Sequence, residues 1–200
     1  MARYQRKDHF HQRAKREGAR SRAFYKLDEF QRAHRVLRPG DRVVDLGCWP
    51  GGWLQCAAAA VTGKGRVVGI DLAPIEPALE LAQVRSLTGD LEDPAVVGVL
   101  RAALEAPRCD VLLSDAAPKL TGIRDADRAA EERLLEAIER LLPELLRGGG
   151  TLLLKILEGP EAQAIDRRIR SHFGRARSIK TQATRKGSAE RYLLARDFSG

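Results

Sequence analysis

Two charged residues stand at the ends of apolar runs, where a charge is unfavourable unless it is paired or used. Asp115 follows Val-Leu-Leu-Ser, and Lys155 follows Leu-Leu-Leu within LLLKIL. Taking an ammonium group out of water is costly without a partner. Burial near Asp115 would hold the amine in place, and desolvation would favour its neutral, basic form. Lys155 is therefore a candidate general base; a strand-end lysine that reaches solvent is the alternative.

A glycine-rich turn, DLGCWPGGW from Asp45 to Trp53, joins an expected strand to an expected helix. Its glycines let a ligand approach the backbone, and the helix N-terminus adds partial positive charge. The spacing is not G-x-G-x-x-G, because Trp49 stands where dinucleotide enzymes need a glycine beside the pyrophosphate. A nicotinamide enzyme is therefore disfavoured, and an ordinary helix-start turn is the other alternative.

Two aspartates follow the next two expected strands. Asp71 ends the strand that contains Gly-Ile-Asp, where its carboxylate can accept hydrogen bonds from both ribose hydroxyls of a nucleoside. Asp90 follows Gly89, where it could accept a hydrogen bond from an adenine amino group. Either aspartate alone could be a turn residue. With the glycine-rich turn they indicate a nucleoside pocket without a pyrophosphate cradle, which suits S-adenosylmethionine.

Helical and strand patterns alternate along the chain and predict how these residues are positioned. Alternation implies an α/β fold with a doubly wound, mostly parallel sheet, whose ligands bind beyond the carboxyl ends of the strands. Residues 3–17 are expected to form a helix or a mobile arm. Gly148–Gly150 are expected to end the long helix over residues 125–146. The expected helices are 20–36, 53–61, 93–104, 125–146 and 161–173, and the expected strands are 42–46, 66–71, 83–87, 109–114, 151–156, about 176–181 and 191–195, the last two as a hairpin.

Charge is unevenly distributed in this chain of 200 residues, which carries a formal net charge of +8. Residues 1–38 contain 12 Lys and Arg against 4 Asp and Glu, whereas residues 39–166 contain 13 against 21. Residues 167–200 contain 10 against 2. If the two basic ends meet, they form a positive surface able to neutralise phosphates, although solvated surface charge is the alternative. Nucleic acid is the favoured partner.

Several classes of protein are disfavoured by composition. The 3 cysteines contain no C-x-x-C pair and the 4 histidines no metal spacing, so neither a disulfide framework nor a metal site is expected. No apolar run follows the basic N-terminus, and none is long enough for a membrane span. A cytoplasmic protein is expected, and a monomer by default, because no long heptad or isolated apolar face requires a partner chain.

The sequence resembles the RrmJ/FtsJ family of S-adenosylmethionine-dependent RNA ribose 2′-O-methyltransferases. The shared landmarks run from about Asp8 to Ala195 and are, in order, SRAFYKLDEF, DLGCWPGGW, GIDL, TGDL, LLSDAAP, GGGTLLLKIL and SAERYLLA. The resemblance implies a Rossmann-like seven-stranded sheet and methyl transfer without a metal. The expected acceptor is a uridine of 23S ribosomal RNA in the large ribosomal subunit. A tRNA target, or a degenerate RNA-binding protein of ribosome assembly, are the alternatives.

The resemblance also implies a Lys-Asp-Lys-Glu tetrad of Lys26, Asp115, Lys155 and Glu190. In this reading Lys155 takes the proton of the 2′-hydroxyl or orients its lone pair, and Asp115 positions Lys155 beside the methyl donor. Lys26 holds a phosphate or ribose oxygen, and Glu190 orients one of the lysines. The implied cofactor contacts are Gly51, Trp53, Asp71, Asp90 and Asp115, with Asp45 supporting the methionine end.

By this resemblance, residues 1–38 are a basic N-terminal helical extension and residues 39–200 the methyltransferase domain.

Three departures from the family pattern leave the RNA target open rather than the chemistry: Trp49 stands where a small residue is usual, Lys119 replaces asparagine, and Ile-Leu-Glu-Gly follows Lys155. Trp49 could crowd the cofactor mouth or pack against it. The basic residues expected to contact RNA phosphates are Arg3, Arg6, Lys7, Arg13, Lys15, Arg16, Arg20, Arg22, Arg167, Arg168, Arg170, Arg175, Arg177, Arg185 and Lys186.

Overall fold

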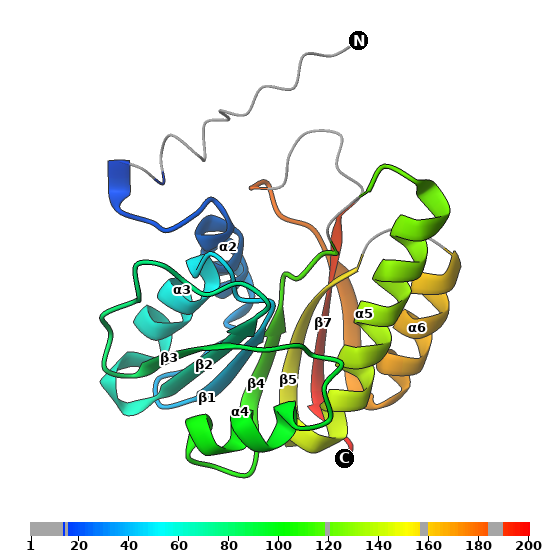
Figure 1. The fold of residues 1–200 in the computed structure, drawn as a ribbon. Helices are drawn as coiled ribbons and strands as arrows, with labels where there is room; N and C mark the ends of the chain where they lie inside the picture. Colours follow the sequence, from blue (N-terminus) through cyan, green and yellow to red (C-terminus); the bar gives the residue numbers. More distant parts are fainter. Residues whose placement is uncertain (1–13, 15, 119–120, 157–159, 184–189) are drawn as a thin grey trace.

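The computed structural model describes residues 14, 16–118, 121–156, 160–183 and 190–200. Its centre is one seven-stranded sheet with the order β3-β2-β1-β4-β5-β7-β6 (Figure 1). Strands β1 to β5 run parallel, and β7 is antiparallel to both of its neighbours. The predicted fold class and the C-terminal hairpin are confirmed. The strands are β1 (Arg42–Leu46), β2 (Arg66–Asp71), β3 (Val84–Thr88), β4 (Cys109–Ser114), β5 (Leu146–Ile156), β6 (Phe173–Ile179) and β7 (Arg191–Phe198).

Helices cover both faces of the sheet because successive strand residues point to opposite sides. In β1, Val44 belongs to the apolar cluster beneath α4, α5 and α6, whereas Val43 belongs to the cluster beneath α2 and α3. Both side chains are fully buried. The helices are α2 (Ala23–His34), α3 (Gly52–Val61), α4 (Val96–Leu104), α5 (Arg124–Leu145) and α6 (Pro160–Ser171), with a short 3-10 turn, η1 (Thr62–Lys64), after α3. None of these described helices has the length and apolar character that a membrane span requires.

The largest departure from the expected boundaries concerns Gly148–Gly150, which lie within β5 and do not end a helix. Helix α5 ends at Leu145, and β5 begins at once with Leu146 paired to Cys109. The register then shifts, so that Val111 pairs with Thr151. Glycines allow this irregularity because one of them, Gly149, has a φ of +74°.

Other boundaries move by a few residues. Helix α2 is shorter than predicted at both ends, and α4 begins at Val96 rather than at Asp93. Strand β6 begins at Phe173, which was assigned to the preceding helix, and β7 continues to Phe198. The predicted helix or arm at residues 3–17 lies mostly outside the described residues.

The direction of each strand decides which residues meet at which edge of the sheet. The carboxyl ends of β1, β4 and β5 lie together because these strands are parallel. The amino end of the antiparallel β7 reaches the same edge, where Tyr192 pairs with Lys155. Helix α2 is held there by Phe30, whose ring centroid lies 4.8 Å from that of Tyr192. One edge of the sheet therefore collects residues that are far apart in sequence.

Candidate active site

Four charged side chains meet at this edge. Lys26, from the first turn of α2, lies 3.2 Å from an Asp115 carboxylate oxygen and 3.1 Å from Oε2 of Glu190. Lys155, near the end of β5, donates a hydrogen bond of 2.6 Å to the main-chain carbonyl of Asp115 and lies 3.3 Å from its Oδ1. Both lysines are buried, and the carboxylates are only slightly exposed. The structure thus brings together all four members of the expected tetrad.

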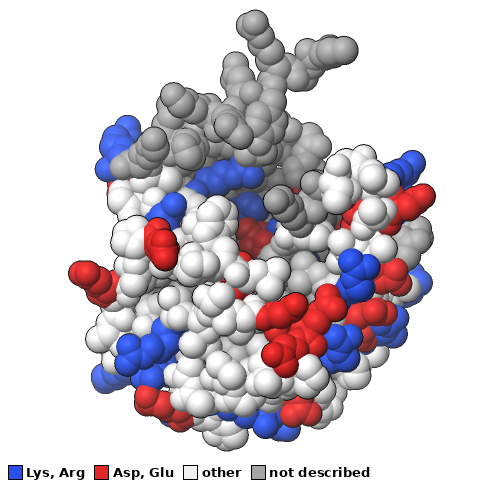
Figure 2. Space-filling model, in the orientation of Figure 1, with Lys and Arg blue, Asp and Glu red and all other residues white. Residues whose placement is uncertain are grey.

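The charges of this cluster balance, with two ammonium groups facing two carboxylates. Burial alone would raise the pKa of Asp115, but the nearby Lys155 and Lys26 ammonium groups and the Tyr192 hydroxyl hold it below its usual value. The Asp115 carboxylate therefore remains ionised between its cationic neighbours. Charges paired in this way tolerate removal from water far better than single buried charges. In Figure 2, side chains of both signs lie in a recess below the grey atoms.

Tyr192 is a fifth member of the cluster that the sequence reasoning missed. Its hydroxyl donates a 2.7 Å hydrogen bond to Asp115 Oδ1 and accepts one of 2.8 Å from Lys26 Nζ. Burial and the Asp115 carboxylate raise the pKa of Tyr192 far above its ordinary value, so the hydroxyl keeps its proton and acts as a donor. The alternation of side chains along a strand could have indicated it, because Tyr192 stands two residues after Glu190.

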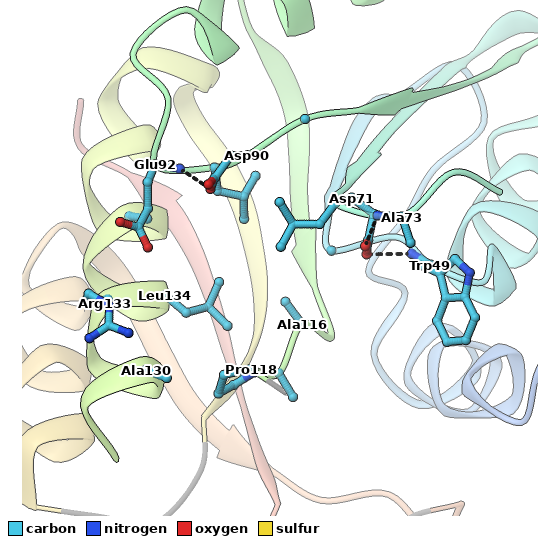
Figure 3. A pocket seen from close by; sticks show the side chains of 16 residues that line it. Trp49, Asp71, Ala73, Asp90, Glu92, Ala116, Pro118, Ala130, Arg133 and Leu134 are labelled. Atoms are coloured by element: carbon cyan, nitrogen blue, oxygen red, sulfur yellow. Dashed lines mark hydrogen bonds between the residues drawn. The ribbon is translucent and has the colours of Figure 1, made fainter. Parts of the chain in front are cut away.

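A cavity of about 760 Å³ opens beside the cluster (Figure 3). Its walls come from the ends of β1, β2, β3 and β4 and from one side of α5, and they are mostly apolar. Asp71 and Asp90, the two aspartates expected to contact a nucleoside, border it, and Ala116 and Pro118 form the side nearest Asp115. A cavity of this size and lining suits a small organic ligand with a few polar groups.

The two aspartates of this cavity are fixed by main-chain amides. Asp71 accepts hydrogen bonds from Trp49 N at 2.9 Å and from Ala73 N at 3.1 Å, one on each carboxylate oxygen. Asp90 accepts one of 2.9 Å from Glu92 N. Because a carboxylate oxygen has two lone pairs, each aspartate keeps acceptor capacity for hydroxyl or amino groups of a ligand.

A second, much smaller cavity lies between the first one and α2, and it is bordered by Asp45, Trp53 and Asp115. Neither carboxylate oxygen of Asp45 has a hydrogen-bond partner among the described residues, and the same holds for Trp53 Nε1. Burial, together with the charges of Asp115 and Asp71, raises the pKa of Asp45 well above its usual value. Buried groups of this kind normally have partners, so a carboxylate and an indole N–H without one could hold a cationic and an anionic group of a ligand.

The glycine-rich turn shapes the wall between the two cavities. Gly47 has a φ of +79°, and a Cβ placed there would lie 2.4 Å from the Cβ of Ala116. Only glycine lets the ends of β1 and β4 approach so closely. Gly51, an expected cofactor contact, caps α3 and borders neither of the two cavities. Trp49 borders both and is 58% exposed, so its indole stands at the rim of the cavities.

Comparisons with known proteins agree with this geometry. Residues 19–198 match the FtsJ-like methyltransferase family. The ribosomal RNA large subunit methyltransferase E of Methanothermobacter thermautotrophicus is 39% identical over 194 residues, which cover 97% of this chain and 91% of that protein. The protein of the same name from Acidithiobacillus ferrooxidans is 40% identical over 194 residues, covering 97% and 87%.

Solved structures show the same architecture. A Plasmodium falciparum protein described as a ribosomal RNA methyltransferase superposes with a TM-score of 0.78 at 26% identity, covering 90% of this chain and 99% of that one. Fibrillarin of Aeropyrum pernix, in complex with S-adenosyl-L-methionine, superposes with a TM-score of 0.60 at 17% identity, covering 80% and 68%. The second likeness is one of fold alone.

Proposed function

This chain belongs to the FtsJ-like methyltransferase family, and we propose that it transfers a methyl group from S-adenosylmethionine to a ribose 2′-hydroxyl of RNA. The observation that carries the proposal is the position of Asp115. Its carboxylate contacts Lys26 and Lys155, and the residue borders the small cavity beside the larger one. Methyl donor and acceptor hydroxyl would thus meet next to two amines and a carboxylate.

The residues around the two cavities fit the cofactor. Asp71 would accept hydrogen bonds from the ribose hydroxyls, and Asp90 from the adenine amino group. The unpartnered Asp45 carboxylate and Trp53 N–H would bind the charged ends of the methionine portion. When bound, S-adenosylmethionine supplies an activated methyl group on a sulfonium sulfur. The protein then has to align the hydroxyl and remove its proton.

In this proposal Lys155 receives the proton of the 2′-hydroxyl or orients its lone pair. Its two contacts to Asp115 hold Nζ at the end of β5. The Asp115 carboxylate is shared with Lys26 and Tyr192. Lys26, placed between Asp115 and Glu190, would bind an oxygen of the target nucleotide, and Glu190 would orient Lys26. General base catalysis of this kind contributes roughly 10²–10⁴-fold to a rate.

The substrate that we propose is a uridine of 23S ribosomal RNA in the large ribosomal subunit. Two similar proteins are named ribosomal RNA large subunit methyltransferases, and the uridine is what the family resemblance implies. The alternative within the same chemistry is a tRNA. A different class of function, an RNA-binding assembly protein with a degenerate site, is disfavoured because Lys26, Asp115, Lys155 and Glu190 contact one another in a continuous cluster.

The test combines labelled S-adenosylmethionine with large ribosomal subunits from cells that lack this enzyme, with free tRNA in parallel. Labelled RNA is digested with alkali, which cannot cleave beside a 2′-O-methyl group. We expect label in an uncleaved dinucleotide from ribosomal RNA, and its loss in Lys155→Ala protein that still binds cofactor. Label on tRNA alone would show that the substrate is tRNA and not ribosomal RNA. Wild-type transfer rates in Lys155→Ala would refute the role of Lys155, and absent cofactor binding would favour the assembly-protein alternative.

A further inference from the structure

A second concentration of charge lies at the edge of the sheet opposite the active site. Strand β7 pairs with β5 so that Tyr192 faces Lys155 at the active edge and Arg196 faces Thr151 at the other. Four residues of strand separate the two positions, which corresponds to about 13 Å. Arg175 of β6 pairs directly with Arg196. Arg175 is one of the basic residues expected to contact RNA phosphates, and its pairing with Arg196 places it away from the active site.

Six arginines border two adjoining hollows at this edge, and five of them, all except Arg147, are here called the arginine surface. A hollow of about 550 Å³ lies over Arg175, Arg177 and Arg196, on the outer strands of the sheet. A smaller polar cavity of about 160 Å³ shares Arg175 and Arg196 and is bordered also by Arg35 and Arg38, which follow α2. The surface is therefore concave and continuous across two strands and a loop.

The arginine surface has more positive than negative charge. Arg175 pairs with Asp197 at 2.7 Å, and Asp41 accepts a hydrogen bond from the main-chain N–H of Arg38. Arg177, in contrast, has a neutral hydrogen-bond partner, the ring of His34, at 3.0 Å to Nδ1. Two carboxylates thus accompany five guanidinium groups. Arg147 and Asp110 form a further ion pair at the rim, and this pair adds no net charge to the surface.

Arg196 holds this surface in shape through neutral partners. Its guanidinium donates to the main-chain carbonyls of His34 and Arg35 at the end of α2. Burial and the charges of Arg175, Arg177 and Arg38 lower the pKa of Arg196. Burial and Arg177 likewise lower the pKa of His34. Burial is the larger cause of both shifts, and the neighbouring arginines act in the same direction.

We propose that the arginine surface binds phosphate groups of the RNA substrate, at nucleotides away from the one that enters the active site. The proposal rests on the proposed function, since it assumes that RNA is the substrate. Arginine forks match phosphate oxygens in geometry and charge. An extended polyanion fits better than a small anion, because the charges are spread along a shallow surface. A long RNA contacting the active edge can reach a site about 13 Å further along the strand.

The test is a double variant, Arg175→Gln/Arg177→Gln, which leaves the helix contacts of Arg196 in place. The matched control is Arg85→Gln/Arg108→Gln, which removes the same charge from two exposed positions that border neither hollow. Binding of labelled large-subunit ribosomal RNA fragments of decreasing length is measured at several salt concentrations. We expect the arginine-surface variant to bind long fragments roughly tenfold more weakly, with a log–log salt slope smaller by about 1.5 to 2. The control should bind like wild type.

Three further results would accompany a phosphate-binding role. The KM for RNA rises whereas kcat at saturating RNA is unchanged, the affinity for cofactor is unchanged, and fragments too short to reach the surface bind equally to both proteins. If the variant bound long RNA with the affinity and salt slope of wild type, the proposal would be overturned. The same result is expected if the arginine surface binds an acidic protein and not RNA, so that alternative would also refute the proposal. If wild-type protein bound RNA but transferred no methyl group, the proposed methyltransferase activity would be refuted. The proposal for the arginine surface would stand, because the binding measurement does not depend on methyl transfer.

Discussion

The Tyr192 hydroxyl joins Lys26 to Asp115: it accepts a hydrogen bond from the Lys26 ammonium at 2.8 Å and donates one to the Asp115 carboxylate at 2.7 Å. The tyrosine ring is fully buried, with the Phe30 ring at 4.8 Å and the Trp53 ring at 6.1 Å. Packing therefore fixes the ring, and the ring fixes the hydroxyl. A residue with no charge of its own sets the distance between two charged members of the tetrad.

Tyr192→Phe tests this positioning role. The substitution keeps the ring and removes one donor from Asp115, so the pKa of that carboxyl should rise toward its ordinary value. A hydrogen bond to a charged group contributes about 1.5–3 kcal/mol, which corresponds to a fall in kcat of roughly 10- to 100-fold. The acid limb of the pH–rate profile should move to higher pH. Tyr25→Phe is the control, because Tyr25 donates to Glu17 and not to Asp115; equal rates in the two variants would refute the role.

The tetrad illustrates what a sequence can and cannot predict. Asp115 and Lys155 were predictable as neighbours, because they end adjacent parallel strands, and charged residues in apolar runs draw attention. Lys26 and Glu190 were implied only by the family resemblance. Lys26 lies 89 residues from Asp115 and 164 from Glu190 along the chain, and no local pattern encodes such contacts. Tyr192 was missed because a tyrosine in a strand ordinarily indicates packing.

The strand through Gly148–Gly150 and the position of Arg175 could not be predicted from local sequence, for different reasons. Gly148–Gly150 usually mark the end of a helix, but here pairing with β4 extends the strand through them, an effect of tertiary structure that overrides local preference. The positions of Arg175 and Arg196 depend on strand direction. A hairpin was predicted correctly, yet charge counts along the chain cannot tell which edge of a sheet each arginine reaches.

Asp115→Asn should make the protein less stable in a pH-dependent manner. The folded-state pKa of Asp115 lies below its unfolded value of about 3.9. Its contribution to stability is therefore present above that value and is lost as pH falls through the folded-state pKa. At pH 7 we expect a loss of about 3 kcal/mol, since two buried ammonium groups would then face one carboxylate. Urea unfolding at pH 7 and at pH values below 4 measures the difference, which should shrink in acid.

Asp115→Asn/Lys155→Met provides the check on that explanation. Removing one of the two ammonium groups restores the charge balance with Glu190, so part of the lost stability should return. If the double variant were as unstable as the sum of the two single variants, electrostatic pairing would not explain the effect.

Gly47→Ala should damage the wall between the two cavities. The added Cβ meets Ala116 Cβ at 2.4 Å, and the φ of +79° is itself unfavourable for alanine. We expect a loss of at least about 2 kcal/mol in unfolding free energy, together with weaker cofactor binding, because the ends of β1 and β4 must separate. Gly63→Ala is the control, since nothing lies within 4 Å of a Cβ there and its φ is outside the left-handed region. Equal stability of the two variants would contradict the close approach.

Asp45→Asn should change stability and cofactor affinity in opposite directions. Asp45 is 1% exposed and has no hydrogen-bond partner among the described residues, and its pKa is raised well above the usual value. An acid whose folded-state pKa exceeds its unfolded value of about 3.9 loses stability as pH rises between the two. The asparagine variant lacks this loss, so its melting temperature relative to wild type should increase with pH over that interval.

The same substitution should weaken binding of S-adenosylhomocysteine by at least roughly tenfold, because the variant loses the charge opposite the ligand's amino group. Isothermal titration calorimetry measures the affinity without requiring catalysis. Asp41→Asn is the matched control: burial raises the pKa of Asp41 too, but this residue precedes β1 at the opposite edge of the sheet and borders neither cofactor cavity. Wild-type affinity in Asp45→Asn would show that the unpartnered carboxylate serves the fold and not the ligand, because a group that binds an ammonium cannot lose its charge without consequence.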